Sequence, residues 1–484
     1  MTRLVRIALI VVAAAACSPA GPRGAAANDA GPGSNGMMDG AGYTVTVRDL
    51  GDGRFGVDYL LADAQSALIF SRSSGDYRVG AWSPVGSGVQ LERLHGFDAL
   101  LFDAPRTEFS LIVEPRFVSP PGDYSPYVGF SDGSLAIYTG QFEVLAVADT
   151  GSIAALDGNL GAWQGEQYTM GVRILSDRRM VFDGEIVDGS VEHTARGNGA
   201  FVYLGDGEIT ARRSYVGVLD RGLPTWVLEA MDDDMESIFE TYETRWQHPL
   251  EERAVLYFAY GGGEQGGYSN KGSVIDRSIL MSSSGQAMSE PSPDLRTYLR
   301  WFFAHEVAHQ FQNLRGQGSG TIGESWIHEG GANTMATGLV AQMLGEAGPD
   351  YLSATYAREY AQCLPVLAAG PLETAHLRDQ SGGFYACGAL IGLVIDEATP
   401  DGDIYTVWLA MQALSEQRDE QRSRALFFEA AGQAGVDADL IAHLDRLIDG
   451  GADDPAAQLR RAMDMAGLAA EFDGNNQLIT LQQP

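Results

Sequence analysis

The chain has 484 residues, which is enough for two or three domains that each bury a core. Hydrophobic residues make up 45% and charged residues 20%, the mixture typical of a soluble globular protein. The formal net charge of −32 gives a surface that repels phosphate backbones, so we expect no nucleic-acid partner.

Residues 1–17 have the pattern of an export signal. Arg3 and Arg6 give a positive start, and residues 7–16 form an apolar stretch too short to span a bilayer as a mature helix. The sequence Ala14-Ala15-Ala16-Cys17 resembles a bacterial lipobox, with alanine where the consensus prefers leucine. We expect a signal peptide with a lipobox and a lipid anchor on Cys17; ordinary cleavage at the alanine run is the alternative. Because Ser18 follows, resemblance to bacterial lipoproteins implies export to the periplasmic face as an outer-membrane lipoprotein.

The composition changes several times along the rest of the chain. Residues 18–42 are rich in Gly, Ala, Pro, Ser and Asn, which cannot bury a core, so we expect a flexible tether. Short β-forming runs, separated by turn pairs such as Asp52-Gly53, predict a β-rich domain over 43–232. The pattern then becomes mostly helical, and we expect a catalytic domain over 233–420 and a C-terminal helical segment over 421–484.

Within the expected catalytic domain, helical patterns enclose a small sheet. Apolar spacing predicts a helix over 232–246 and a strand over 254–260. A glycine-rich stretch, 261–272, precedes a second predicted strand over 273–281, and from Pro293 onward the pattern is nearly all helical. The expected fold class is therefore multidomain α+β: an all-β N-terminal domain, then a mostly helical catalytic domain with a small edge sheet.

The candidate chemistry lies in the HExxH motif formed by residues 305–309. On a helix, four residues advance by roughly 400° and about 6 Å, so His305 and His309 leave the same face one turn apart. Their ring nitrogens can then converge on one Zn²⁺ ion. Glu306 lies one residue round the helix, where it can reach a metal-bound water without ligating the metal.

A zinc site of this kind needs a third protein ligand and one position open to water. Glu329 is a candidate, with 19 residues between it and His309; Glu324 and His328 are rivals, but neither has the flanking pattern described below. Asn333 follows Glu329 by four residues on the same helix face, where it can accept a hydrogen bond from a ligand histidine or serve as a packing amide. Four glycines allow the chain to turn back between the two motifs: Gly316, Gly318, Gly320 and Gly323.

Apart from Cys17, the chain has two cysteines, Cys363 and Cys387. In an oxidising compartment two such cysteines can pair, and the bridge would join two predicted helices near the site. Two small buried thiols are the alternative, because sequence alone gives no distance between them.

The motifs resemble those of the gluzincin zinc metallopeptidases, and within them of the aminopeptidase N family and the related glycyl aminopeptidases. The family pattern is HExxH, a gap of about 18 residues and then W-x-x-E-G, which Trp326-Ile327-His328-Glu329-Gly330 matches with one extra residue in the gap. Nineteen is the gap of the thermolysin branch. The resemblance covers about 230–400 and implies a thermolysin-like catalytic domain preceded by a saddle-like β domain.

Further residues take their expected roles from this resemblance. Tyr385-Ala386-Cys387-Gly388-Ala389 is similar to the family's Y-x-x-G-A segment, whose tyrosine stabilises the oxyanion, and this role is implied for Tyr385. Residues 266–272 fall where the family carries G-A-M-E-N-x-G, which implies substrate binding by Gly266, Gly267, Ser269 and Asn270. Ser269 replaces the glutamate that binds the substrate's free amine, and a serine supplies no negative charge.

The expected function is zinc-dependent hydrolysis of peptide bonds by an exported, aminopeptidase-like metallopeptidase. Its cofactor would be Zn²⁺ and its substrate a peptide or protein, with Glu306 as the general base. Two alternatives stay open at this point. The protein is an endopeptidase of the same superfamily, or it is a zinc-bearing binding lipoprotein without turnover.

Overall fold

The computed structural model describes residues 36–73, 75–120, 123–195, 198–318, 320–400, 402–450, 454–474 and 477–482. The predicted signal peptide, Cys17 and most of the predicted tether lie outside these residues. The described residues form two compact units, one within Pro22–Leu223 and Arg253–Gln286, the other within Pro224–Glu252 and Ala287–Pro484. The predicted boundaries after 232 and 420 stay predictions. No described helix is both long enough and apolar enough to cross a membrane.

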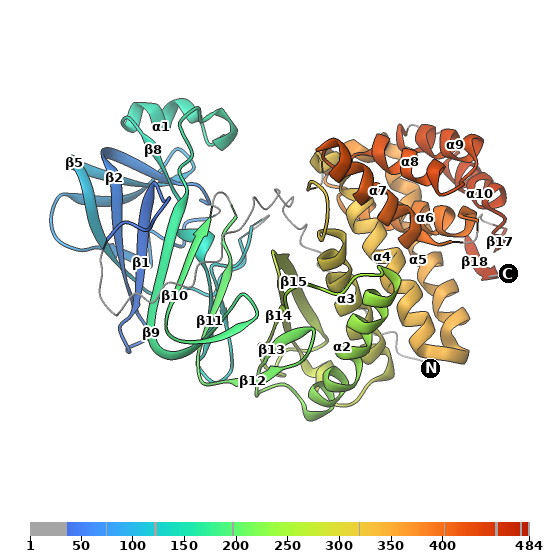
Figure 1. The fold of residues 1–484 in the computed structure, drawn as a ribbon, viewed down its shortest axis with the longest axis horizontal. Coiled ribbons are helices and arrows are strands. Elements are labelled where there is room, and N and C mark those ends of the chain that lie inside the picture. Colours follow the sequence, from blue (N-terminus) through green and yellow to red (C-terminus); the bar gives the residue numbers. More distant parts are fainter. Residues whose placement is uncertain are drawn as a thin grey trace. The chain divides into compact units, whose positions relative to one another are not determined.

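The first unit contains a large sheet of eleven strands, drawn from blue to green in Figure 1. Its main path has the order β3-β5-β2-β1-β9-β11-β7-β6, with β10 paired to β9, β4 to β5 and β8 to β2. All described pairs are antiparallel except β1 with β9. The strands are β1 (Tyr43–Asp49), β2 (Phe55–Phe70), β3 (Trp82–Pro84), β4 (Val89–Leu94), β5 (Phe97–Val113), β6 (Tyr127–Gly129), β7 (Leu135–Tyr138), β8 (Val144–Val147), β9 (Met170–Phe182), β10 (Glu185–Ala195) and β11 (Phe201–Leu204); helix α1 (Thr150–Leu156) follows β8.

A second sheet in the same unit has the order β12-β13-β14-β16-β15. Strands β13, β14 and β16 are parallel, and the outer strands β12 and β15 run antiparallel to their neighbours. The predicted strand over 254–260 coincides with β14. The five strands are β12 (Glu208–Ala211), β13 (Tyr215–Leu219), β14 (Ala254–Tyr260), β15 (Ser269–Ile275) and β16 (Ser278–Ser284).

The single strand predicted over 273–281 is wrong, because the chain forms a hairpin there. Strand β15 ends at Ile275 and β16 begins at Ser278, with Ile275 paired to Ser278. Asp276 between them has a φ of 54°, in the left-handed region that a short polar side chain tolerates in tight turns. The turn has no glycine of its own, so the apolar residues on its two sides read as one continuous run.

One apolar cluster joins the two sheets of the first unit. It includes Tyr138 and Phe201 from the large sheet and Val255 and Tyr257 from the second sheet, all buried. The Tyr257 hydroxyl donates to the carbonyl of Val181 at 3.2 Å, so its polar end is satisfied inside the core.

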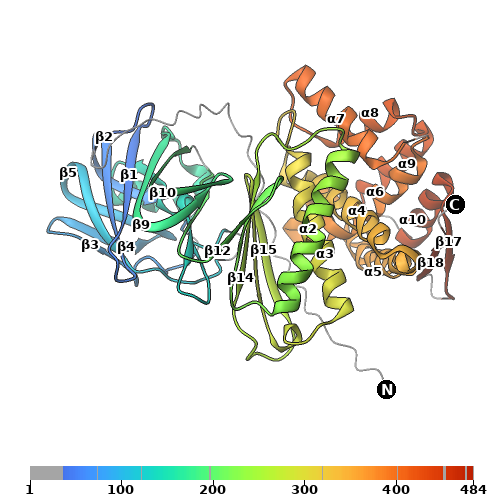
Figure 2. The ribbon, with the colours of Figure 1, turned by 60° about the horizontal axis from the view of Figure 1, so that its bottom comes forward.

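The second unit is mostly helical, as Figure 2 shows for α2 to α10. Helix α4 contacts α3, α5, α6 and α7 and therefore lies at the centre of this unit. The predicted helix over 232–246 belongs to α2, which begins earlier. The helices are α2 (Thr225–Arg245), α3 (Pro293–Gln312), α4 (Ser325–Leu344), α5 (Gly348–Ala369), α6 (Gly382–Ala398), α7 (Ile404–Arg418), α8 (Arg424–Gln433), α9 (Ala438–Ile448) and α10 (Pro455–Ala466).

The chain does not stay helical to its end as expected. Strands β17 (Ala469–Phe472) and β18 (Leu478–Gln482) form a two-stranded sheet after α10, and β18 packs against α5. The described residues nevertheless confirm the predicted class. The protein is mixed α+β, with a large N-terminal sheet domain and a helical C-terminal domain.

Helices α4 and α6 approach each other closely because glycines meet at their crossing. A Cβ atom on Gly330 would collide with the backbone of Gly388, and a Cβ atom on Gly388 would collide with the carbonyl of Trp326. Beyond this point the Thr334 hydroxyl lies 2.9 Å from the carbonyl of Gly330 and 3.2 Å from that of Ala389 on α6. The register between the two helices is therefore set by backbone contact and by a buried hydroxyl.

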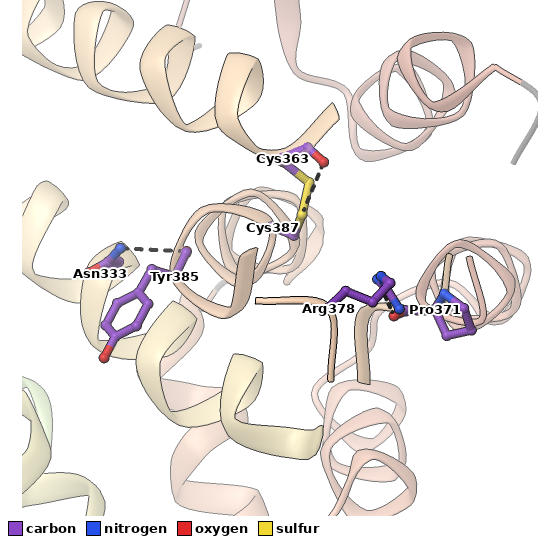
Figure 3. Close-up of a disulfide and its surroundings, with 6 residues drawn as sticks. All are labelled: Asn333, Cys363, Pro371, Arg378, Tyr385 and Cys387. Atoms are coloured by element: carbon purple, nitrogen blue, oxygen red, sulfur yellow. Dashed lines mark hydrogen bonds between the residues drawn. A yellow bond between two sulfur atoms is a disulfide. The ribbon is translucent and has the colours of Figure 1, made fainter. Parts of the chain in front are cut away.

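A disulfide between Cys363 and Cys387 joins α5 to the first turns of α6 (Figure 3). Both sulfurs are buried, and the two Cα atoms lie 4.8 Å apart. In Figure 3 the Tyr385 ring points away from the bridge, although Tyr385 precedes Cys387 by only two residues. Helix α6 is thus tied to α5 on one side and carries Tyr385 on another.

The glycine crossing predicts a specific pattern of stability. Gly388→Ala has to separate α4 from α6 and should lower the free energy of unfolding by about 1–3 kcal/mol, as overpacking does. Gly382→Ala, on the same helix, has no heavy atom within 4 Å of the new Cβ and should be neutral or raise stability by up to about 1 kcal/mol. Denaturant unfolding of both variants checks this, and equal stabilities would contradict the close crossing.

Candidate metal centre

Helix α3 carries the HExxH motif in its last turns. The helix begins after Ser292, whose side chain accepts a hydrogen bond from the backbone N–H of Leu295 at 3.2 Å, and Pro293 occupies the first helical position. Its sequence from 302 to 312 is buried throughout. The capped N-terminus therefore fixes where α3 begins, and the motif lies in the buried part of the helix near its end.

Helix α4 brings the third candidate ligand from a separate stretch of chain. The short 3₁₀ turn η4 (Ile322–Glu324) precedes it, and the Glu324 carboxylate accepts from the backbone N–H of Thr321 at 3.0 Å, which completes a capping box. Glu324 also accepts from the backbone N–H of Arg424 at 2.8 Å. The carboxylate of Glu324 is thus used in starting the helix, and Glu329 lies one turn further along.

The structure brings His305, His309 and Glu329 together, and all three side chains are buried. The two Nε2 atoms are 3.0 Å apart, and Glu329 Oε2 lies 3.3 Å from the Nε2 of His305 and 3.4 Å from that of His309. Neighbouring ligand atoms of a tetrahedral zinc with bonds of roughly 2.0–2.1 Å are about 3.3–3.4 Å apart. The spacing of the three donor atoms therefore fits such an ion with a movement of a few tenths of an ångström.

The charges of the three groups also suit a cation. Burial alone would raise the pKa of the Glu329 carboxyl, but the two histidines beside it hold that pKa well below its usual range. Burial alone would lower the pKa of His309, and the Glu329 carboxylate outweighs this effect and raises it. A buried anion facing two imidazole nitrogens offers one carboxylate oxygen and two nitrogens, the donor set that zinc accepts.

Glu306 follows the first histidine and does not belong to this group of three. Glu306 as a residue is nine per cent exposed, so little solvent reaches it. Burial raises the pKa of the Glu306 carboxyl, His305 and His309 oppose the rise, and Glu329 adds to it. A carboxyl with a raised pKa is suited to taking a proton and giving it back near neutral pH.

Tyr385 reaches the site from the start of α6. Its ring centroid lies 6.0 Å from that of His305, with 26° between the ring planes. Its backbone carbonyl accepts a 3.5 Å hydrogen bond from Asn333 Nδ2, the contact drawn in Figure 3. We predicted that Asn333 accepts a hydrogen bond from a ligand histidine. Within the described part of the chain this bond is not formed, because Asn333 Oδ1 is buried without a hydrogen-bond partner.

His328, a rival ligand in the sequence, stacks on His309 instead of joining the group. The ring centroids are 4.1 Å apart and the planes differ by 17°. Burial holds the pKa of His328 well below its ordinary value, so the ring is neutral. His328 therefore supports the face of a candidate ligand.

One residue of the site was not singled out from the sequence. Gln312 Oε1 lies 2.8 Å from His309 Nδ1, and Gln312 Nε2 donates to the carbonyl of His328 at 3.0 Å. Its position three residues after His309, on the same helix face, is the feature of the sequence that could have identified it as a partner of that histidine.

The four predicted substrate-binding residues lie in the first unit. Ser269 and Asn270 begin the outer strand β15, and Gly266 and Gly267 precede it in the loop. Strand β15 thus begins before the strand predicted over 273–281, and the two glycines lie outside it. An outer strand of a sheet is the kind of element with which an extended peptide can pair. Their role in binding substrate stays a prediction.

The fold is similar to that of an aminopeptidase N family protein of known structure. A crystal structure of an aminopeptidase N family protein from Idiomarina loihiensis matches 89% of this chain and 79% of its own, with a TM-score of 0.63 and 11% identity. Native yeast LTA4 hydrolase matches 91% of this chain and 68% of its own, with a TM-score of 0.44 and 9% identity. No protein-family model and no curated protein matches the sequence. The likeness to the Idiomarina loihiensis protein shows a common fold. The chemistry depends on the residues of the site, because one fold can carry several functions.

The arrangement predicts which carboxylate binds metal. Glu329→Gln removes the only anionic donor of the group of three and should weaken Zn²⁺ binding by more than about 100-fold, beyond the 10–100-fold typical when a partner of a ligand is lost. Glu324→Gln, the matched control, should leave the affinity unchanged because that side chain caps a helix. Competition with a chromogenic chelator measures both. A loss of affinity in the control alone would reverse the assignment.

Proposed function

We propose that this protein is a zinc-dependent peptidase of the gluzincin type, in which His305, His309 and Glu329 hold the metal. The observation that carries the proposal is the convergence of these three buried side chains, with Glu306 on the same helix and the Tyr385 ring next to His305. The likeness in fold to an aminopeptidase N family protein supports it.

The chain's own residues supply the steps around the metal. When bound, zinc provides Lewis acidity and a water molecule of lowered pKa. Glu306 accepts a proton from the attacking water and later passes it to the leaving amine. The Tyr385 hydroxyl donates a hydrogen bond to the oxygen on which negative charge develops. Burial of the three donors keeps solvent away from the ligand atoms themselves.

We infer that the enzyme is aminopeptidase-like, and the replacement of the family's glutamate by Ser269 makes its mode the point to test. A free ammonium group needs an anionic partner, and serine provides none. Digestion of matched peptides with free and acetylated N-termini by the metal-loaded protein, with a chelator control, separates the two modes. Cleavage of free peptides alone supports the aminopeptidase, and internal cleavage of both supports an endopeptidase.

Export, lipidation of Cys17 and an outer-membrane location are part of the same proposal. The Cys363–Cys387 disulfide supports export, because structural disulfides persist in oxidising compartments. Mass spectrometry of the mature N-terminus from membrane fractions tests lipidation, and a mature chain beginning within the alanine run would contradict it.

Replacement of the proposed base should separate metal binding from turnover. Glu306→Gln keeps the size of the side chain but cannot accept the proton, so kcat should fall by about 10²–10⁴-fold. Zinc content should stay at one ion per chain, because Glu306 is not a ligand. Peptide hydrolysis and metal analysis on the same preparation check both. Retained turnover would refute the general-base role.

Removal of the Tyr385 hydroxyl should reduce kcat and leave KM nearly unchanged. Tyr385→Phe loses one donor to the transition state, an effect typically worth about 10²–10³-fold in kcat. Tyr360→Phe is the matched control, since its hydroxyl donates to the carbonyl of Ala456 and it is not one of the site residues. The expected result is full activity in Tyr360→Phe. Equal activity in both variants would remove Tyr385 from the reaction.

A further inference from the structure

We propose that Gln312 is a positioning residue that holds His309 in the tautomer with its proton on Nδ1, and so keeps Nε2 free for the metal. The proposal rests on the zinc function proposed above and assigns a new part of that site. It is carried by one juxtaposition, the buried Gln312 amide lying between the His309 ring and the carbonyl of His328.

The orientation of the Gln312 amide follows from its two neighbours. The carbonyl of His328 can only accept a hydrogen bond, so the atom 3.0 Å from it has to be the amide NH₂. The other end of the amide is then an acceptor, and it lies 2.8 Å from His309 Nδ1. An acceptor at this distance requires a proton on Nδ1.

Rotating the amide by half a turn would be unfavourable at both ends. It would bring the oxygen of Gln312 against the carbonyl oxygen of His328, leaving two buried acceptors in contact. It would also direct the NH₂ group at His309 Nδ1 and so stabilise the tautomer with its proton on Nε2. The His328 carbonyl therefore selects the amide orientation, and the amide selects the histidine tautomer.

A neutral His309 ring with its proton on Nδ1 has a lone pair on Nε2, the nitrogen that faces the other two candidate ligands. His309 Nε2 faces the Nε2 of His305 at 3.0 Å and Oε2 of Glu329 at 3.4 Å. A proton on this nitrogen would have to leave before a cation could bind. An imidazole without a fixed partner has both tautomers available, so holding one of them makes the free protein ready for the metal.

The surroundings of Gln312 make the restraint stiff. Gln312 is the last residue of α3, where side chains and carbonyls are ordinarily free to move. Here its side chain is fully buried, and its backbone carbonyl accepts from Gln412 Nε2 at 3.1 Å and from the guanidinium of Arg422. The stack of His328 on His309 fixes the ring plane as well. The helix end is thus held by partners that do not themselves touch the ring nitrogens of His309.

The contrast between the two histidines makes Gln312 more important. His305 Nδ1 is buried and has no hydrogen-bond partner among the described residues. Of the two candidate histidine ligands, His309 is therefore the one whose Nδ1 is held by a side chain. Holding the His309 ring in one tautomer should therefore account for a large part of the preorganisation of the site for Zn²⁺.

Two variants and one control test the proposal on the full chain. Gln312→Met keeps the volume but removes the acceptor, and should weaken Zn²⁺ binding by about 10–100-fold, the usual effect of losing a partner of a ligand histidine. Gln312→Glu keeps an acceptor for Nδ1 but turns a second oxygen toward the His328 carbonyl, so it should bind zinc more tightly than Gln312→Met and less tightly than the original chain. Gln141→Met is the control, because it removes an equally buried amide in the other unit, where Gln141 Nε2 donates to the carbonyl of Pro126.

The readouts are the Zn²⁺ dissociation constant from chelator competition and the ¹⁵N shifts of the His309 ring in the metal-free protein. The expected spectrum shows a protonated Nδ1 in the original chain and in Gln141→Met, and a mixture of tautomers in Gln312→Met. Equal zinc affinity in Gln312→Met and the original chain overturns the proposal, as does a Gln312→Glu variant as weak as Gln312→Met. Zinc binding that follows the expected pattern without any peptide hydrolysis would overturn the proposed function and leave the role of Gln312 standing.

Discussion

A carboxylate buried against two imidazoles is the interaction on which the candidate site depends. Removing the Glu329 carboxylate from water costs several kcal/mol unless positive charge or hydrogen-bond donors face it. In the metal-free chain the rings of His305 and His309 face this carboxylate at 3.3 and 3.4 Å, and they hold the pKa of Glu329 well below its usual range. A divalent cation would satisfy the same requirement more fully. The fold holds the three groups together in advance, which is the arrangement expected of a site that binds metal without first rearranging.

The packing of α4 explains how that arrangement is maintained. Glu329 is next to Gly330, and Tyr385 is three residues before Gly388, so both functional side chains lie close to the point where the two helices touch. Backbone atoms in contact leave less freedom than side chains do, because there are no rotamers to change. The disulfide adds a covalent link from α6 to α5 on another side. The distance between a metal ligand and the proposed oxyanion donor is therefore set by the least adjustable part of the structure.

The fold of the chain and the chemistry of its site rest on different observations. An 11% identical structure with a similar fold establishes the architecture, and many folds carry several unrelated functions. What favours catalysis over simple zinc binding is the presence of Glu306 beside the ligands and of Tyr385 near His305. A scaffold that only binds zinc needs neither a proton acceptor nor an oxyanion donor. Ser269 does not belong to this group of residues, so its place in the sequence bears on the proposed peptide specificity and not on the proposed metal site.

The parts of the site that depend on local geometry were predictable before the fold was known. His305, Glu306 and His309 lie within one turn of a single helix, so their relation follows from the helical repeat and needs no knowledge of the rest of the chain. Strand β14 was likewise readable from its own apolar residues. The hairpin at Asp276 was not, because its turn lacks the glycine that normally marks one, and neither was the two-stranded sheet at the C-terminus, whose edges are defined by packing against α5.

The tertiary structure alone decided which groups meet across the chain. It directs Glu329 toward the histidines, uses Glu324 to begin a helix, stacks His328 on His309 and closes the Cys363–Cys387 bridge. Gln312 belongs to the same class, since its partner carbonyl comes from α4 and the groups that hold its backbone come from α7 and the segment after it. The reason is that a helix specifies positions only along its own axis, whereas the distance between helices depends on which side chains, or which glycines, separate them.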